Sequence, residues 1–263
     1  MNRVLAILCL AVLSFSCIPA TPNSNTGKKK NTPTTSHLEI PAIKQGEVIT
    51  THIGYSVSFN SSYLIPNWVA YELTAEEVMG TVRRPNNSPF QPDPSYGGRQ
   101  PERSDYSRSG WDKGHLAPCA DMKWSEQAMF ESFYFTNVCP QDHSFNERDW
   151  QKLEDLGRNI AKSKGSVYIV CGPIVADNEY GKLGLNQVVI PDAFFKAFLY
   201  KDSNGFHSIG FLMPNKFTGL PLKEYALNVN ELEKLIGIDL FARLSDKIEE
   251  SIESQLILSD WRM

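Results

Sequence analysis

The stretch Asp112-Lys113-Gly114-His115 places a histidine after a glycine, at the end of a polar loop and beside a lysine. Because the unperturbed pKa of imidazole lies near neutrality, a useful fraction of His115 is neutral and can accept a proton. This combination indicates a general base. Taken alone, the four residues fit a surface or structural histidine better, so they do not establish a catalytic site.

Asn146 begins a second candidate segment, 146–163, whose apolar residues fall on one side of a helix. Asparagine is a good helix N-cap, and its carbonyl oxygen is also a ligand for hard cations. In a regular helix Glu154 lies about 80° around and about 12 Å along from Asn146, so it cannot share a coordination shell but reaches a metal-bound water. Glu154 could equally pair with Arg158 at i+4. By themselves these residues favour a cap and a salt bridge.

Overall charge gives no support to a polyanion-binding protein. The formal net charge is −4 over 263 residues, whereas nucleic-acid binders usually carry a basic footprint. Local positive charge does gather ahead of the histidine, at Arg83, Arg84, Arg99, Arg103, Arg108 and Lys113. By charge alone, a solvated loop explains this cluster.

Three motifs follow one another along the middle of the chain. They are Asp-Lys-Gly-His-Leu-Ala-Pro at 112–118, Asn-Val-Cys-Pro-Gln at 137–141, and Asn146 followed by Trp-Gln-Lys-Leu-Glu at 150–154. This order closely resembles the DNA/RNA non-specific endonuclease family, the endonuclease G-like ββα-metal nucleases. Their pattern is Asp-Arg-Gly-His, then Asn-x-x-Pro-Gln, then Asn followed by Trp-x-x-Leu-Glu. Further matching segments extend the resemblance over roughly 52–241.

The resemblance assigns the activation of water to three residues. His115 is implied as the general base and Asn146 as the single direct protein ligand of a magnesium ion, for which manganese could substitute. Glu154 is implied to orient a metal-bound water. Waters would complete the octahedron, as expected for a cation that sheds water reluctantly.

The resemblance also implies contacts to the phosphate. Asn137 would support either His115 or the phosphate. Arg84, and less directly Arg83, would neutralise the phosphorane, and Arg158 would bind a further phosphate oxygen.

Lys113 departs from the family pattern, which usually has arginine at this position. Lysine keeps the charge but cannot make the bidentate phosphate contact of arginine. We therefore expect some loss of rate, or compensation by a nearby arginine, rather than loss of activity.

The function implied by the resemblance is a metal-dependent endonuclease that hydrolyses DNA and RNA. His115 would take a proton from the attacking water, and magnesium would act as a Lewis acid on a non-bridging oxygen and on the departing 3′ oxygen, leaving 5′ phosphates. Phosphate contacts do not read bases, so sequence selectivity should be low. Since water is the nucleophile, no 2′ hydroxyl is needed.

Three alternatives remain open from the sequence. A catalytically weak surface module of the same fold could bind nucleic acid. A different hydrolase could use a carboxylate pair such as Asp121 and Glu131. A zinc site could form from His115, Cys119 and Cys139, although these lack a paired C-x-x-C spacing.

Strand-like and helix-like segments are mixed without regular alternation, which favours an α+β fold with a central, largely antiparallel sheet flanked by helices. With the resemblance, this becomes a ββα-metal nuclease fold. A long loop is expected over 86–110. We expect strands over 47–58, 68–73, 133–138, 166–171, 193–200 and 206–213, and helices over 125–132, 146–163, 230–236 and 245–256.

The N-terminal region has a different composition from the rest. Residues 1–20 contain a short apolar run after Arg3, typical of a signal peptide, with Cys17 as an alternative lipidation site and membrane anchor. We expect a flexible tether over 21–37 and one nuclease domain over 38–263. This predicts an exported protein, whether periplasmic, anchored to the outer membrane or extracellular. The family resemblance also implies a homodimer.

Three cysteines lie in the expected domain: Cys119, Cys139 and Cys171. Because the family motif brings the segments of Cys119 and Cys139 to one site, these two could form a disulfide that contributes roughly 3 kcal/mol on the chain-entropy model. Three buried, reduced thiols are the equally supported alternative.

Overall fold

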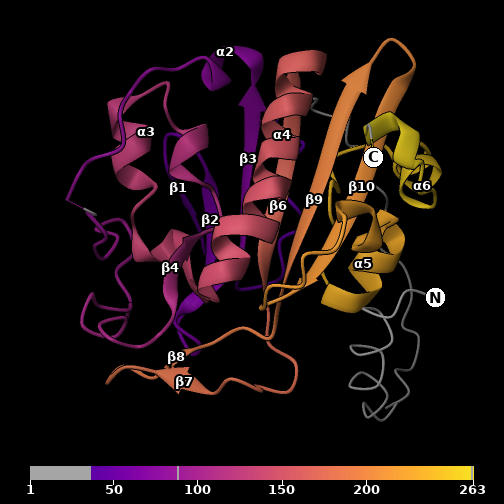
Figure 1. The fold of residues 1–263 in the computed structure, drawn as a ribbon. Coiled ribbons are helices and arrows are strands. Elements are labelled where there is room, and N and C mark those ends of the chain that lie inside the picture. The colour runs from indigo at the N-terminus through magenta and orange to yellow at the C-terminus, as the bar shows by residue number, and fades with distance from the viewer. Residues whose placement is uncertain (1–36, 88, 262) are drawn as a thin grey trace.

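A seven-stranded antiparallel sheet runs through the centre of the chain in the order β1-β2-β3-β6-β9-β10-β11 (Figure 1). The computed structural model describes residues 37–87, 89–261 and 263. The strands of this sheet are β1 Ile49–Thr51, β2 Ser56–Asn60, β3 Ile65–Thr74, β6 Ser166–Ile174, β9 Ala193–Asp202, β10 Gly205–Pro214 and β11 Ala226–Leu227. The predicted α+β class with a largely antiparallel sheet is confirmed.

The long strands β3, β6, β9 and β10 contribute side chains to two cores, because alternate residues point to opposite faces. In β9, Phe194 and Phe198 belong to the core beneath helix α4, which spans Gln151–Lys164, while Phe195 belongs to the core on the other face. Helix α5, Val229–Ile236, packs into that second core, as does part of α6, Asp246–Glu253. The sheet is therefore covered on both faces, and α4 lies on the larger core.

A separate two-stranded sheet carries the histidine motif. Strand β4, Asp112–His115, pairs antiparallel with β5, Val138–Gln141, so that His115 lies opposite Val138. A Cβ at Gly114 would overlap the Gln141 side chain, so this position in the motif must be glycine. Two strands followed by α4 form the ββα unit that the resemblance implied. The segment between the strands contains η1 Cys119–Asp121, α3 Glu126–Glu131 and η2 Phe135–Asn137.

The helix after β5 begins in a wide turn. Residues Phe145–Trp150 form a π-helical turn, η3, that continues into α4. Ser144 is the residue that precedes it, so Asn146 lies inside the turn and the predicted N-cap role of Asn146 is wrong. Since π turns insert extra residues and occur frequently at functional sites, the angle between Asn146 and Glu154 also departs from that of a regular helix.

Close approach of α4 to the sheet depends on one glycine. A Cβ at Gly157 would lie 3.0 Å from a ring carbon of Phe198 and 3.4 Å from Ile169. The helix axis therefore passes directly over β6 and β9 at this point.

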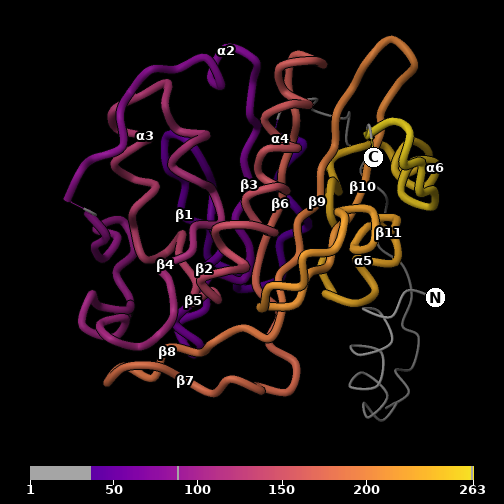
Figure 2. The backbone as a smooth tube through the Cα atoms, in the orientation of Figure 1, coloured from indigo at the N-terminus to yellow at the C-terminus, as the bar shows by residue number. Residues whose placement is uncertain are grey.

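The remaining elements are short. They are α2 Ala75–Val78, β7 Lys182–Leu183, β8 Val188–Val189, η4 Leu222–Glu224 and η5 Leu258–Trp261. The long connection between α2 and β4 has neither helix nor a named strand, as predicted for 86–110, and it passes around the α3 side of the molecule (Figure 2). Within the described residues, no helix combines the length and the apolar character needed to cross a bilayer.

Two of the predicted strands differ from the structure. The predicted strand 47–58 is broken into β1 and β2 by a turn at 52–55. The predicted strand 133–138 is a 3₁₀ turn over Phe135–Asn137, and pairing begins only at Val138. In both places β-forming residues occupy turns because hydrogen bonds to distant segments fix the backbone there.

Candidate active site

His115 closes strand β4 with its ring between two aromatic side chains. The ring centroids of Phe90 and Phe133 both lie 5.1 Å from that of the imidazole. His115 Nε2 is buried and makes no hydrogen bond to any described residue. Burial, reinforced by the nearby Arg84 guanidinium, lowers the pKa of His115 to about 3. The imidazole is therefore neutral at neutral pH, which is the form that can accept a proton.

The backbone around His115 is held at several points. Trp150 Nε1 donates to the His115 carbonyl at 3.2 Å, which ties the start of α4 to the end of β4. The Asn137 amide accepts from Ala117 N at 2.9 Å and donates to the carbonyls of Ala117 and Ser132, both at 2.8 Å. Because Asn137 is fully buried and its amide is committed to these bonds, its contribution in this structure is to the chain segment after His115.

Two cations lie on the aromatic walls of the histidine site. The Arg84 guanidinium lies 5.6 Å from the centroid of Phe133, the same ring that contacts His115, whereas Arg83 is simply exposed. Lys113 Nζ lies 5.6 Å from the Phe90 centroid and 5.5 Å from that of Tyr106.

Burial, reinforced by the charge of Arg103, lowers the pKa of Lys113. Aromatic faces thus position the two predicted phosphate-neutralising cations, Arg84 and Lys113, next to His115.

Asn146 is oriented by the first residue of the histidine motif. Its Nδ2 donates to Asp112 Oδ2 at 2.9 Å, and His143 Nδ1 lies 3.0 Å from the same oxygen. Because a carboxylate only accepts hydrogen bonds, the amide nitrogen must face Asp112, and Asn146 Oδ1 remains as the free ligand atom. An amide oxygen suits a magnesium ion.

No group of three or more histidine, cysteine, aspartate or glutamate side chains among the described residues could hold a metal ion. This excludes the alternative zinc site of His115, Cys119 and Cys139. A magnesium ion at Asn146 would instead rely on water and substrate oxygens, which fits the donor set that is present.

Glu154 lies one α-helical turn beyond Trp150, and it is partly buried between charges of both signs. Burial raises the pKa of Glu154 to about 7, an effect that the cations of Lys196 and Arg158 oppose and that the Asp121 carboxyl reinforces. The two hydrogen bonds of the Arg158 guanidinium go to Asp121, at 2.6 Å, and to Asp155, at 2.7 Å. A simple Glu154–Arg158 pair is therefore not what the structure shows.

The alternative carboxylate pair of Asp121 and Glu131 does not form. Asp121 binds Arg158 and accepts from the Tyr71 hydroxyl at 2.8 Å. Glu131 instead accepts from Ile53 N at 2.8 Å and from a glutamine on its own helix. The two carboxylates thus belong to different hydrogen-bond networks.

The Cys119 thiol is affected by charged groups near His115 and by charged groups near Glu154. Burial raises its pKa, and the charges that act on it are those of Arg84, Glu154, Asp121 and Arg158. The Cys119 thiol therefore lies within electrostatic range of both Arg84, beside His115, and Glu154 on α4.

The three described cysteines are free and buried, so the alternative of a Cys119–Cys139 disulfide is not realised. The reason is register: Cys139 lies opposite Gly114 in the β4–β5 pair, whereas Cys119 lies in η1, beyond the end of β4.

The sequence profile of the DNA/RNA non-specific endonuclease family matches residues 35–247. The chain belongs to this family. A nuclease of Nostoc sp. is 31% identical over 214 residues, covering 77% of this chain and 76% of that relative. The mitochondrial nuclease EXOG of Danio rerio is 33% identical over 214 residues, 74% of this chain, and the aligned part spans 60% of that relative's length.

The fold matches that of a solved member of the family. The crystal structure of the EndoG/EndoGI complex, described as showing the mechanism of EndoG inhibition, superposes with a TM-score of 0.72 at 25% identity and covers 84% of this chain and 96% of that one. The predicted family, its enzyme class and the ββα-metal fold are thereby confirmed.

These relatives contradict the prediction of an exported protein. The EXOG and endonuclease G relatives are named as mitochondrial, as is nuclease 1 of Schizosaccharomyces pombe. Residues 1–20 and most of the predicted tether lie outside the described residues. A short apolar run is a weak guide to compartment because targeting segments are addresses recognised by receptors. The prediction of an exported protein is therefore wrong, and the predicted anchor at Cys17 lies outside the described residues.

Sequence reasoning missed two site residues. From the sequence, Asp112 was only a part of the histidine motif. It lies three residues before the candidate base His115, and an acidic residue there could have been expected to orient a neighbouring side chain such as that of Asn146. Lys196 was visible as the single charged residue in the apolar run 193–200, where Phe194 and Phe198 flank it at i−2 and i+2. In a strand this spacing places a lysine on the core face.

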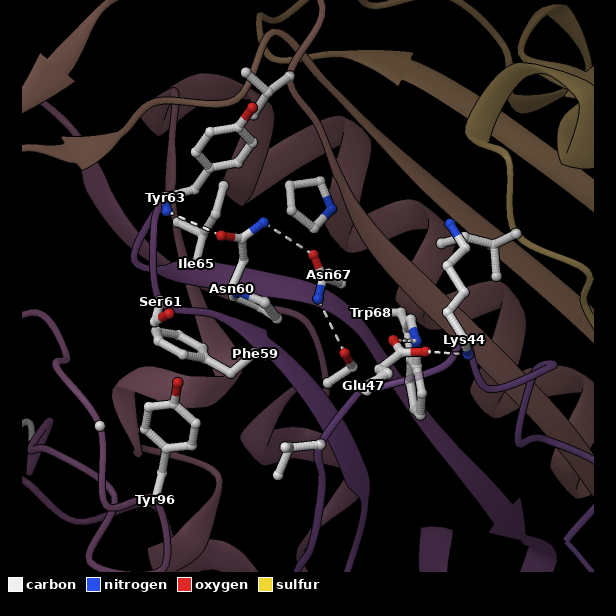
Figure 3. A pocket seen from close by; sticks show the side chains of 18 of the residues that line it. Lys44, Glu47, Phe59, Asn60, Ser61, Tyr63, Ile65, Asn67, Trp68 and Tyr96 are labelled. Atoms are coloured by element: carbon white, nitrogen blue, oxygen red, sulfur yellow. Dashed lines mark hydrogen bonds between the residues drawn. The ribbon is translucent and has the colours of Figure 1, made fainter.

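A cavity of about 650 Å³ lies away from these residues, between β2, β3 and the loop at 42–48. Figure 3 shows its polar side chains bonded to one another: Asn60 donates to Asn67, and Asn67 donates to Ser58. His115, Asn146 and Glu154 do not line it. We assign it no part in the chemistry.

Proposed function

We propose that this chain is a metal-dependent endonuclease that hydrolyses phosphodiester bonds of DNA and RNA with little sequence preference. The observation that carries the proposal is the arrangement of strand β4. One end of the strand, Asp112, fixes the amide of Asn146 with its oxygen free, and the other end presents the neutral His115 with an unpartnered Nε2. Strand β4 thus supplies the proton acceptor and orients the cation ligand, which lies on η3.

In the proposed reaction His115 accepts a proton from water as the water oxygen attacks phosphorus. The bond to the 3′ oxygen breaks, the departing oxygen takes a proton from water, and the products carry a 5′ phosphate and a 3′ hydroxyl. Arg84 and Lys113 oppose the negative charge that grows on the phosphoryl oxygens. Glu154 orients a water beside Asn146. Magnesium, when bound, would supply Lewis-acid stabilisation of the phosphate and the departing oxygen.

The low pKa of the free His115 is consistent with this role. A bound polyanion places negative charge beside the imidazole, and negative charge favours its protonated form. The bound substrate therefore raises the pKa of His115 and makes it a stronger base toward the attacking water.

Broad substrate range follows from what the site contains. Its cations and amides address phosphate and water, and such contacts position a nucleic acid without reading its bases. The names of the related nucleases support nucleic acid as the substrate class. A homodimer, implied by the family resemblance, remains a further prediction for sedimentation measurements.

The test is to incubate the purified chain with closed circular DNA and with single-stranded RNA, each with magnesium and with EDTA, and then to determine the chemistry of the new ends. We expect cleavage of both substrates with magnesium alone, at many sites, and 5′-phosphate ends that ligase accepts. Binding without cleavage would support the catalytically weak binding module instead. Cleavage confined to RNA would show that a 2′ hydroxyl is used.

A further inference from the structure

Lys196 is a fully buried lysine without a hydrogen bond. The residue is 0% exposed, and its Nζ has no partner among the described residues. Lysine is almost never fully buried unless it is paired, because taking an ammonium out of water is strongly unfavourable. A cation kept in this position therefore needs an explanation beyond packing.

The position of Lys196 on the sheet directs it toward α4. It lies opposite Cys171 in the β6–β9 pairing, and its neighbours Phe194 and Phe198 at i−2 and i+2 belong to the core beneath α4. Lys196 Nζ lies 4.3 Å from the centroid of the Trp150 ring. The same indole donates to the His115 carbonyl, so the ammonium sits directly behind the catalytic unit.

The ring of Trp150 brings this cation to Glu154. Residues at i and i+4 are neighbours on one helix face, and Glu154 follows Trp150 by four. Among the charged groups that act on the Glu154 carboxyl, Lys196 has the largest effect on its pKa. The titratable groups that interact with Glu154 are Lys196 on β9, Arg158 and Asp155 on α4, Asp121 and Cys119 on η1, Cys171 on β6 and Tyr71 on β3.

Arg158 is less able to serve Glu154 than its sequence spacing suggests. Its guanidinium is bonded to Asp121 and Asp155, so two carboxylates already share its charge. Lys196 has no such competing bond. Of these two cations, Lys196 is therefore the one that is not bonded to another carboxylate among the described residues.

We propose that Lys196 is a positioning residue whose buried ammonium holds Glu154 in its charged, water-orienting form. This inference rests on the proposed function, since the charged form matters only if Glu154 orients a water for hydrolysis. In this proposal Lys196 touches neither substrate nor metal. Its charge also lowers the pKa of Asp121 and of Cys171, but its catalytic effect is exerted through Glu154.

If Lys196 had only a structural role, replacing it would change stability and leave the pKa of Glu154 unchanged. Replacing a buried charge by an apolar side chain of similar volume is often neutral or stabilising. Lys196→Met should therefore fold and keep its thermal stability while losing the effect on Glu154. Lys201→Met, an exposed lysine in the same strand, is the matched control.

The first measurement is a carboxyl-carbon NMR titration of the metal-free protein, with the Glu154 signal assigned from its absence in Glu154→Gln. In Lys196→Met the pKa of Glu154 should rise by about 1–3 units, as expected for loss of an adjacent opposite charge. Lys196→Arg should restore the wild-type value, and Lys201→Met should not change it. An unchanged titration in Lys196→Met would overturn the proposal. Lys196→Gln serves the same test if the methionine variant does not fold.

The second measurement is the pH dependence of cleavage. Lys196→Met should lower kcat at pH 7 by about fivefold for the first unit of pKa shift and by up to about tenfold for each further unit, while KM stays nearly constant, and the loss should be recovered at higher pH. In a Glu154→Gln background the same substitution should cause no further loss. An additive loss would show that Lys196 acts elsewhere. If wild type does not cleave, the proposed function fails. If Glu154→Gln cleaves at full rate, only the proposed role of Glu154 fails. In both cases the NMR titration still decides whether Lys196 acts on Glu154.

Discussion

Glu154 on α4 and Glu253 on α6 are both removed from water, but their surroundings differ in the sign of charge. Around Glu154 the cations of Lys196 and Arg158 oppose the effect of burial, and the pKa is raised only to about 7. Glu253 is 2% exposed, and burial together with the carboxyls of Glu233 and Glu249 raises its pKa to about 9.

Burial is the largest cause of the raised pKa of both carboxyls, and the comparison shows that the sign of the neighbouring charges then sets how far each pKa rises. A carboxyl that ionises near neutrality can change its charge under working conditions, and Glu154 belongs to the candidate active site. Glu253 stays protonated up to about pH 9 and is therefore a neutral, buried side chain of α6. The two regions should therefore respond differently to mutation and to pH.

The largest expected effect is on the α4 side. His115→Ala should lower the cleavage rate by about 10²–10⁴-fold, the usual contribution of a general base, without loss of folded protein. The matched control is His207→Ala, because His207 lies near the C-terminus and pairs with Asp202 and Asp260. Cleavage rates per folded molecule, with the folded fraction measured by circular dichroism, should fall in His115→Ala and stay near the wild-type value in His207→Ala. Equal losses in both variants would remove the distinction between the regions.

Asn146→Ala should weaken the magnesium dependence and the activity together. The effect on metal affinity should be at least the roughly 10–100-fold that follows loss of an outer-shell partner. Because Asn146 lies inside the η3 turn and caps nothing, its loss should destabilise the fold by less than the about 1 kcal/mol of a missing cap. Magnesium titrations of rate and thermal unfolding measure both. A marked fall in stability with unchanged activity per folded molecule would contradict this account.

Glu253→Gln should change stability but not activity. The folded pKa of about 9 lies above the value of 4.5 for an unfolded chain. The stabilisation from this proton is thus fully present below about pH 4.5 and is lost as pH rises through about 9. The variant keeps a neutral side chain, so it should unfold at a higher temperature than wild type at pH 9, by about 2–4 °C for each kcal/mol.

At pH 4 the two proteins should unfold at nearly the same temperature. Glu154→Gln provides the comparison, since its stability difference should develop around pH 7 and its activity should fall. If the unfolding temperatures of Glu253→Gln and wild type changed in parallel with pH, Glu253 would be ionised in the folded protein and this prediction would be wrong.

The smallest expected effect is that of Lys113→Arg, which should keep or modestly raise activity. Arginine can retain the stacking on Phe90 and Tyr106 and adds a bidentate phosphate contact. Initial rates on a short duplex decide this. A large drop would mean that the site has been built around lysine.

The sequence was a good guide wherever a pattern is local. The spacing of Trp150, Leu153 and Ile160 predicts α4, and the apolar runs predict β3, β6, β9 and β10 to within a few residues. The order of the three motifs was sufficient to identify the ββα unit. Each of these signals depends on neighbours a few positions away in the chain.

What the sequence could not reveal depends on distant contacts. The η3 turn ends at Trp150, the first of the periodic apolar residues, so the pattern carries no sign of the π turn and predicts a helix that begins at Asn146. The backbone at Asn137 is bent so that its amide can reach Ala117 and Ser132, which no propensity for strand foretells. The separation of Cys119 from Cys139 follows from register, and the charge beside Glu154 comes from β9, more than forty residues along the chain.

In the proposed function, Asp112, Asn146 and His115 form one unit in which a magnesium ion and a neutral imidazole act together. The most direct test is a nicking assay on closed circular DNA in which magnesium is titrated against wild type and Asp112→Asn, a variant that leaves His115 in place. Asp112→Asn should need about 10–100-fold more magnesium to reach half its maximal rate, and EDTA should abolish nicking by both proteins. Nicking that persists in EDTA, or identical magnesium curves for the two proteins, would contradict the account.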